Sequence, residues 1–136
     1  MHPPAIGIYA ALLTGLYLLL AARVIGARRA ARVALGTGGD AVIERRARVH
    51  ANFAEYVPIA VLLLLLLEMA GYPRWVVHAL AAPFLLARIA HAWGMSQANE
   101  DFRFRTGGMI VTFAVLAAAA ALLAAAAVLN PASVGR

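Results

Sequence analysis

Four apolar runs, each about as long as a bilayer is thick, constrain this chain more than any other feature of its sequence. They cover about residues 4–25, 49–70, 75–95 and 107–129, and polar or turn-forming segments separate them. At about 1.5 Å per residue, a helix of some twenty residues spans roughly 30 Å, the thickness of a hydrocarbon core. We therefore expect one all-α domain over residues 1–136, an integral membrane bundle of four helices.

The composition excludes an ordinary soluble domain. Hydrophobic residues make up 64% of the chain, charged residues 13%, and the mean hydropathy is +0.82. A soluble domain is about half apolar and about a quarter charged. The chain has no cysteine, which excludes disulfides, thiolate metal sites and a cysteine nucleophile, and we predict no metal centre.

The basic residues predict how the helices are oriented. All twelve cations are arginines, and they cluster beside the apolar runs, a pattern typical of membrane anchors and not of a nucleic-acid site. Residues 26–48 hold six arginines and residues 96–106 hold two, whereas residues 70–74 hold one. An excess of arginine marks the cytoplasmic side. The first and third loops are therefore predicted to be cytoplasmic, and both termini to lie on the opposite side of the membrane.

One face of the second predicted helix carries an unusual set of polar side chains. At 100° per residue, Arg45, Arg48, Asn52, Glu55 and Tyr56 fall within an arc of about 100°. Two interpretations are open. An ion pair between Arg48 and Glu55 would anchor the end of the helix, whereas a polar pocket would bind a small zwitterionic or anionic ligand.

Further polar residues are expected at a similar depth. Arg28 and Arg29, after the first apolar run, are typical membrane anchors, but a guanidinium can also bind a carboxylate through two hydrogen bonds. Arg88, His91 and Met95 share a face of the third helix within about 60°. His91 is either a binding residue or a donor between two helices.

Several of these motifs resemble the MAPEG family, the membrane-associated proteins of eicosanoid and glutathione metabolism. Residues 48–58, RVHANFAEYVP, are similar to the family signature. Arg28-Arg29 resembles the end of its first helix, and Leu86-Ala87-Arg88-Ile89 its third-helix motif. The resemblance covers nearly the whole chain and implies a homotrimer that binds glutathione between neighbouring subunits near the cytoplasmic face.

The resemblance also implies roles for individual residues. Glutathione carries two carboxylates and one ammonium, and a complementary site needs separated cations and one anion. By resemblance, Arg48, Asn52, Glu55 and Tyr56 hold the γ-glutamyl end, and Arg28 meets the glycine carboxylate, with Arg29, Arg88 and His91 as further cofactor-binding candidates.

The resemblance leaves the chemistry open. Catalytic members of the family stabilise the glutathione thiolate with an arginine, for which Arg103 and Arg105 are the candidates. Where glutathione-using relatives carry tyrosines, this chain has His91 and Met95. One hypothesis is a glutathione transferase or peroxidase for lipophilic electrophiles, and the alternative is a non-catalytic lipid-binding or scaffolding protein. A small multidrug-type transporter would need an acidic residue in its first helix, and residues 9–22 contain none.

Overall fold

The computed structural model describes residues 4–99 and 101–129, and it contains four long helices in this part of the chain. They are α1 (Ile6–Ala30), α2 (Ala41–Met69), α3 (Arg74–Ser96) and α4 (Phe102–Leu129). All four are long and apolar enough to cross a membrane. The prediction of an all-α bundle with four candidate membrane spans is confirmed. The helices α1 and α2 extend beyond the apolar runs into the arginine-rich segment between them.

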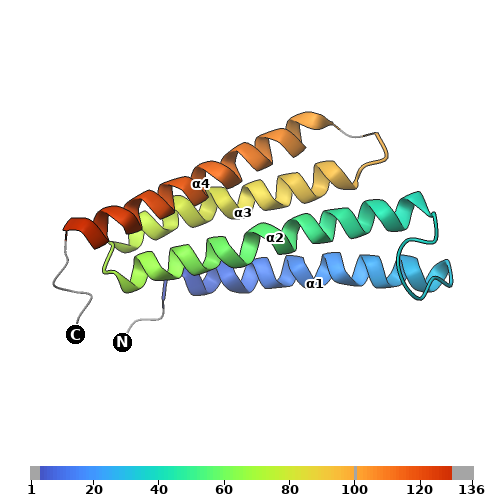
Figure 1. Cartoon of the computed structure of the whole chain (residues 1–136), viewed down its shortest axis with the longest axis horizontal. Helices are drawn as coiled ribbons and strands as arrows, with labels where there is room; N and C mark the ends of the chain where they lie inside the picture. The colour runs from blue at the N-terminus through green and yellow to red at the C-terminus, as the bar shows by residue number, and fades with distance from the viewer. Residues whose placement is uncertain (1–3, 100, 130–136) are drawn as a thin grey trace.

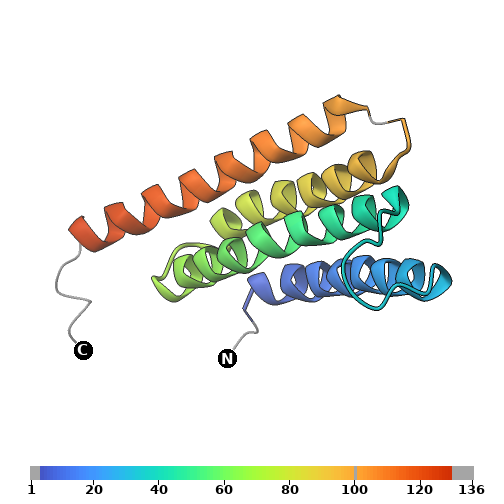
Figure 2. The same ribbon diagram turned by 45° about the vertical axis from the view of Figure 1, so that its right-hand side comes forward.

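The helices pack as antiparallel neighbours in the order of the chain (Figure 1). The helices α2 and α3 lie at the centre, while α1 and α4 lie on opposite sides of them in both views (Figure 2). The α1–α2 and α3–α4 connections share one end of the bundle, and the α2–α3 turn lies at the other. We call the first of these the arginine end, because α1 ends there with Arg28 and Arg29 in its last turn.

Local signals explain where the helices begin and end. The Asp40 carboxylate caps α2 by accepting hydrogen bonds from the backbone N–H groups of Val42 (2.7 Å) and Ile43 (3.0 Å). At the far end of α2, the Glu68 carboxylate accepts hydrogen bonds from the backbone N–H groups of Ala5 and Ile6 and so caps α1. Glu68, which is 62 residues from Ile6 in the sequence, therefore links the end of α2 to the start of α1.

Glycines bring α3 and α4 unusually close together at the arginine end. A methyl group on Gly108 of α4 would lie 2.7 Å from the carbonyl oxygen of Ala87 and 2.7 Å from Cβ of His91 on α3. A methyl group on Gly94 of α3 would lie 2.7 Å from Cβ of Phe104 on α4. Small residues of this kind permit close helix packing in membranes, where lipid is as apolar as the side chains it replaces.

We predict that Gly108→Ala destabilises the bundle by about 1–3 kcal/mol, because the added methyl group must push against backbone and Cβ atoms. Gly107→Ala is the matched control, since a methyl group there meets no atom within 4 Å. The free energy of unfolding can be measured in mixed micelles at increasing sodium dodecyl sulfate. Equal stability of the two variants would show that α3 and α4 are not in close contact at Gly108.

Candidate functional site

The centre of the candidate site is a guanidinium that is fully buried between three helices. The Arg88 side chain on α3 is 0% exposed. Its Nη2 donates a hydrogen bond of 2.7 Å to Oδ1 of Asn52 on α2, and its Nη1 lies 3.4 Å from Oγ1 of Thr112 on α4. The guanidinium carbon lies 5.6 Å from the ring centre of Phe53 and 5.8 Å from that of Tyr56. We call Arg88, Asn52, Tyr56 and Thr112 the Arg88 cluster.

The burial of Arg88 is costly, and the cluster supplies the compensation. A charge removed from water must find hydrogen bonds or other electrostatic partners. The aromatic rings of Phe53 and Tyr56 face the guanidinium as cation–π partners, and the negative charge of the Glu55 carboxylate favours the charged form of Arg88. Its Nε is buried and has no hydrogen-bond partner among the described residues. Arg88 therefore serves to hold the surrounding side chains in place and does not present its charge at a surface.

The α2 face predicted from the sequence is divided in the structure. Asn52 and Tyr56 are half-buried against α3 and α4, whereas Arg48 and Glu55 are exposed. Neither Arg48 nor Glu55 forms a hydrogen bond or an ion pair with another described residue of the chain. The first of the two interpretations left open by the sequence, an ion pair between Arg48 and Glu55, is therefore not observed among the described residues.

Arg28 and Arg29 lie elsewhere at the arginine end. They line a cleft of about 440 Å³ together with Arg32, and Nε of Arg28 donates a hydrogen bond of 3.2 Å to the carbonyl oxygen of Gly36. Within the described residues, this cleft shares no lining residue with the α2 face that carries Arg48. A single chain consequently does not bring the predicted cations together around one cavity.

His91 lies in the contact between α3 and α4. Its side chain is 2% exposed, and its Nδ1 lies 2.9 Å from the carbonyl oxygen of Arg105, which can only accept a hydrogen bond. This is the helix-to-helix role that the sequence left open for this histidine. The candidate catalytic arginines differ in exposure: Arg105 is half-buried, whereas Arg103 is exposed and lines a groove of about 390 Å³ beside Phe104.

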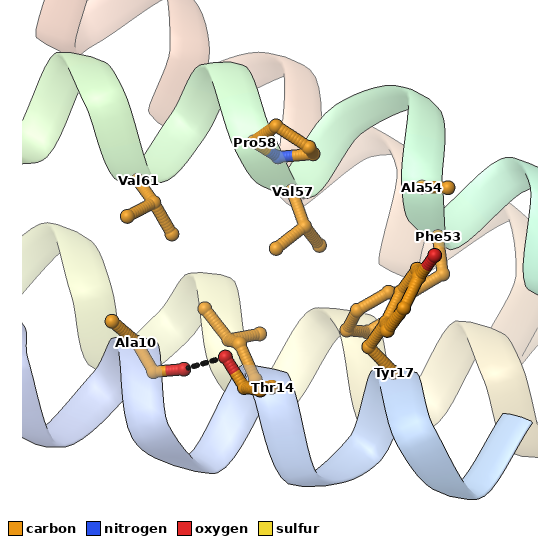
Figure 3. Close-up of a pocket in the computed structure, with 9 residues that line it drawn as sticks. Ala10, Thr14, Tyr17, Phe53, Ala54, Val57, Pro58 and Val61 are labelled. Carbon is orange, nitrogen blue, oxygen red and sulfur yellow. Dashed lines mark hydrogen bonds between the residues drawn. The ribbon is translucent and has the colours of Figure 1, made fainter. Parts of the chain in front are cut away.

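The structure also contains an apolar groove that the sequence did not predict. It has a volume of about 450 Å³, and its lining includes Thr14 and Tyr17 of α1 and Val57, Pro58 and Val61 of α2. Figure 3 shows the side chains of Val57 and Val61 directed towards α1. The hydrogen bond drawn in Figure 3 runs from Oγ1 of Thr14 to the carbonyl oxygen of Ala10 within α1. The Thr14 hydroxyl therefore already donates its hydrogen bond inside the helix. A groove of this composition suits a hydrocarbon chain. Finding it required the relative rotation of α1 and α2, which apolar runs do not specify.

These features define an integral membrane class: four membrane-length helices packed around a buried polar cluster, with a charged face left open on α2. Comparison with known proteins identifies the family. Residues 6–125 match the model of the MAPEG family, and the chain belongs to that family. It is 36% identical over 109 residues to the inner membrane protein YecN of Escherichia coli K12, over 80% of this chain and 82% of that protein. The YecN of Escherichia coli O6:H1 is similar to the same extent.

We predict that Arg88→Ala lowers the free energy of unfolding by about 2–4 kcal/mol, because it leaves a cavity and removes the donor that Asn52 accepts from. The control is Arg29→Ala, an exposed arginine whose truncation should change stability by at most about 0.5 kcal/mol. Unfolding in mixed micelles, followed by circular dichroism, measures both variants. A stability of Arg88→Ala equal to that of Arg29→Ala would mean that the cluster contributes nothing.

Proposed function

We propose that this protein binds glutathione at a site between the subunits of a homotrimer. The observation that carries the proposal is the division of the α2 face. Arg88 contacts Asn52 and Tyr56 on the inner side of this face, while Arg48 and Glu55 are exposed and form no hydrogen bond or ion pair with another described residue. A cation, an anion and two hydrogen-bonding groups are thus arranged along about two turns of one helix.

The chemistry of glutathione matches this arrangement. Its γ-glutamyl end carries one carboxylate and one ammonium, and Arg48 and Glu55, about two turns apart on the same face of the helix, supply the opposite charges. The Asn52 amide and the Tyr56 hydroxyl suit the polar groups of a peptide. Arg28 and Arg29 are assigned to the glycine carboxylate, which a guanidinium can bind through two parallel hydrogen bonds.

The proposed site requires a second copy of the chain. Within one chain Arg28 and Arg29 line a different cleft from the Arg48 face, so one subunit supplies only part of a complementary surface. Many members of the family bind glutathione, which supports the same assignment here. A homotrimer in which neighbouring copies complete each site also provides partners for Arg48 and Glu55.

We further propose a bacterial inner-membrane location with the arginine end in the cytoplasm. The curated relative YecN is named as an inner membrane protein. Residues 26–48 and 96–106, the helix ends and connections at the arginine end, hold eight of the twelve arginines, whereas residues 70–74 around the α2–α3 turn hold one, which is the asymmetry that the positive-inside rule describes. Both termini are then periplasmic, and the surrounding lipids cover the exposed apolar side chains.

The proposed reaction is attack of the glutathione thiolate on a lipophilic electrophile that reaches the site through the bilayer. A free thiol has a pKa near 8.5, and lowering this to about 6.5 requires about 2.7 kcal/mol of stabilisation of the thiolate. The guanidinium of Arg103 or Arg105 is the proposed source. The alternative is a non-catalytic lipid-binding or scaffolding protein, which is favoured by the engagement of His91 in a contact between helices.

Calorimetric titration of the purified protein with glutathione tests the binding proposal. We expect saturable heat at millimolar glutathione and a dissociation constant raised about tenfold in Arg48→Ala and in Glu55→Gln, because each removes a hydrogen bond to a charged group. Glu44→Gln is the control, since Glu44 is an exposed carboxylate in the first turn of the same helix. The absence of saturable heat would exclude binding, and unchanged affinity in both site variants would place the site elsewhere.

Turnover of glutathione with a model aryl halide or a lipid hydroperoxide separates the two functional hypotheses. For an enzyme we expect a rate about 100-fold lower in Arg103→Ala or Arg105→Ala, whichever guanidinium faces the thiolate. Arg74→Ala, at the opposite end of the bundle, should keep the parent rate. Binding of glutathione without turnover of either substrate class would favour the non-catalytic alternative.

A further inference from the structure

A second basic cleft lies inside the bundle at the arginine end, where α1 and α3 approach their ends and α2 begins. Its volume is about 340 Å³. Three arginines and one hydroxyl contribute its polar lining and two valines part of its apolar lining: Arg23, Arg45, Arg46, Ser96, Val42 and Val49. None of these residues belongs to the set assigned to glutathione, so the proposed function does not explain the cleft.

Hydrogen bonds to neutral oxygens fix these arginines in place. Nη1 of Arg23 donates to Oγ of Ser96 (3.1 Å), and Nη1 of Arg46 donates to the carbonyl oxygen of Arg23 (3.1 Å). Nη1 of Arg45 donates to the carbonyl oxygen of Gln97 (2.7 Å). Membrane-anchor arginines normally extend into water, but Arg23 and Arg46 are half-buried and held within the bundle.

The local charge remains positive at Arg23 and Arg46. Each guanidinium has five N–H donors, and among the described residues neither side chain forms an ion pair with a carboxylate. The first turn of α2 also lines the cleft through Ala41 and Val42. Because the Asp40 carboxylate already caps this helix end, the positive charge of the cleft comes from the guanidinium groups. A cleft with these groups is complementary to an anion that has several acceptor oxygens.

We propose that this cleft binds a phosphate group, and specifically the phosphodiester of an anionic phospholipid. Guanidinium groups bind phosphate oxygens through paired hydrogen bonds. Basic pockets between membrane helices on the cytoplasmic side are suited to lipid headgroups. Val42 lines the cleft and is 55% exposed, so an apolar side chain lies next to the cations. An acyl chain can pack there while the phosphate occupies the cleft.

Titration with phosphatidylglycerol, with phosphatidylcholine of identical chains as the comparison, tests the proposal on the full-length protein in neutral detergent. Native mass spectrometry counts the bound lipids. We expect preferential binding of phosphatidylglycerol, with an affinity about fivefold lower in Arg23→Gln and in Arg46→Gln, since one cation near a lipid surface contributes about 1 kcal/mol.

Two further variants keep the test interpretable. Arg32→Asn removes an exposed charge at the same end but outside the cleft, and asparagine tolerates the left-handed backbone at this position (φ 56°), so binding should remain. Val42→Glu places an acid in the cleft at an exposed position of the first helical turn, where an acid favours the helix. It should weaken phosphatidylglycerol binding without lowering stability, even if the arginine variants fail to fold.

Inorganic phosphate distinguishes the two possible sources of the ligand. Phosphatidylglycerol binding that millimolar phosphate does not displace supports a lipid site. Phosphate binding that is itself lost in Arg46→Gln and Val42→Glu supports the same cleft with a soluble phosphate compound as its ligand. Equal binding of the two phospholipids, or an equal loss in Arg32→Asn and Arg46→Gln, would overturn the proposal. None of these outcomes depends on whether glutathione binds.

Discussion

The structure depends above all on how a bundle of apolar helices accommodates one buried guanidinium. Arg88 cannot reach water, so its donors and its charge must be met by other helices. Asn52 of α2 accepts from Nη2, Thr112 of α4 lies within hydrogen-bond distance of Nη1, and the ring of Tyr56 lies against the charge, while Nε has no partner among the described residues. Arg88 lies on α3, and its hydrogen-bond partners lie on α2 and α4. The need to bring these partners to the guanidinium therefore constrains the rotation of α2 relative to the other two helices.

That rotation determines which residues of the candidate site face outwards. Residues three or four positions apart share one face of a helix. When Asn52 and Tyr56 turn towards Arg88, Arg48 and Glu55 on the flank of the same face are left at the surface of the chain. The interior of the bundle therefore determines where the charges of Arg48 and Glu55 are exposed. This connects the packing of α3 and α4 to the proposed binding of glutathione on α2.

The sequence predicted the helices better than the site. Apolar runs of bilayer length were enough to locate four helices, although α1 and α2 extend beyond these runs. Spacing along α2 placed Arg48 and Asn52 within one arc, but it could not show that one is exposed and the other half-buried. That distinction depends on Arg88, 36 residues from Asn52. The capping of α1 by Glu68 was hidden for the same reason, since it joins distant parts of the chain.

Arginines at one end of a membrane bundle can have different roles even though the positive-inside rule treats them alike. The rule counts charges, and it accounts for orientation without reference to contacts. The structure separates them by environment: Arg48 is exposed, whereas Arg46 is held by the carbonyl oxygen of Arg23 beside a cleft. An exposed cation can bind a partner or ligand from outside, while a held cation is already oriented for an anion that enters the cleft. The proposed glutathione site and the proposed lipid site therefore depend on arginines in two different environments at the same end of the bundle.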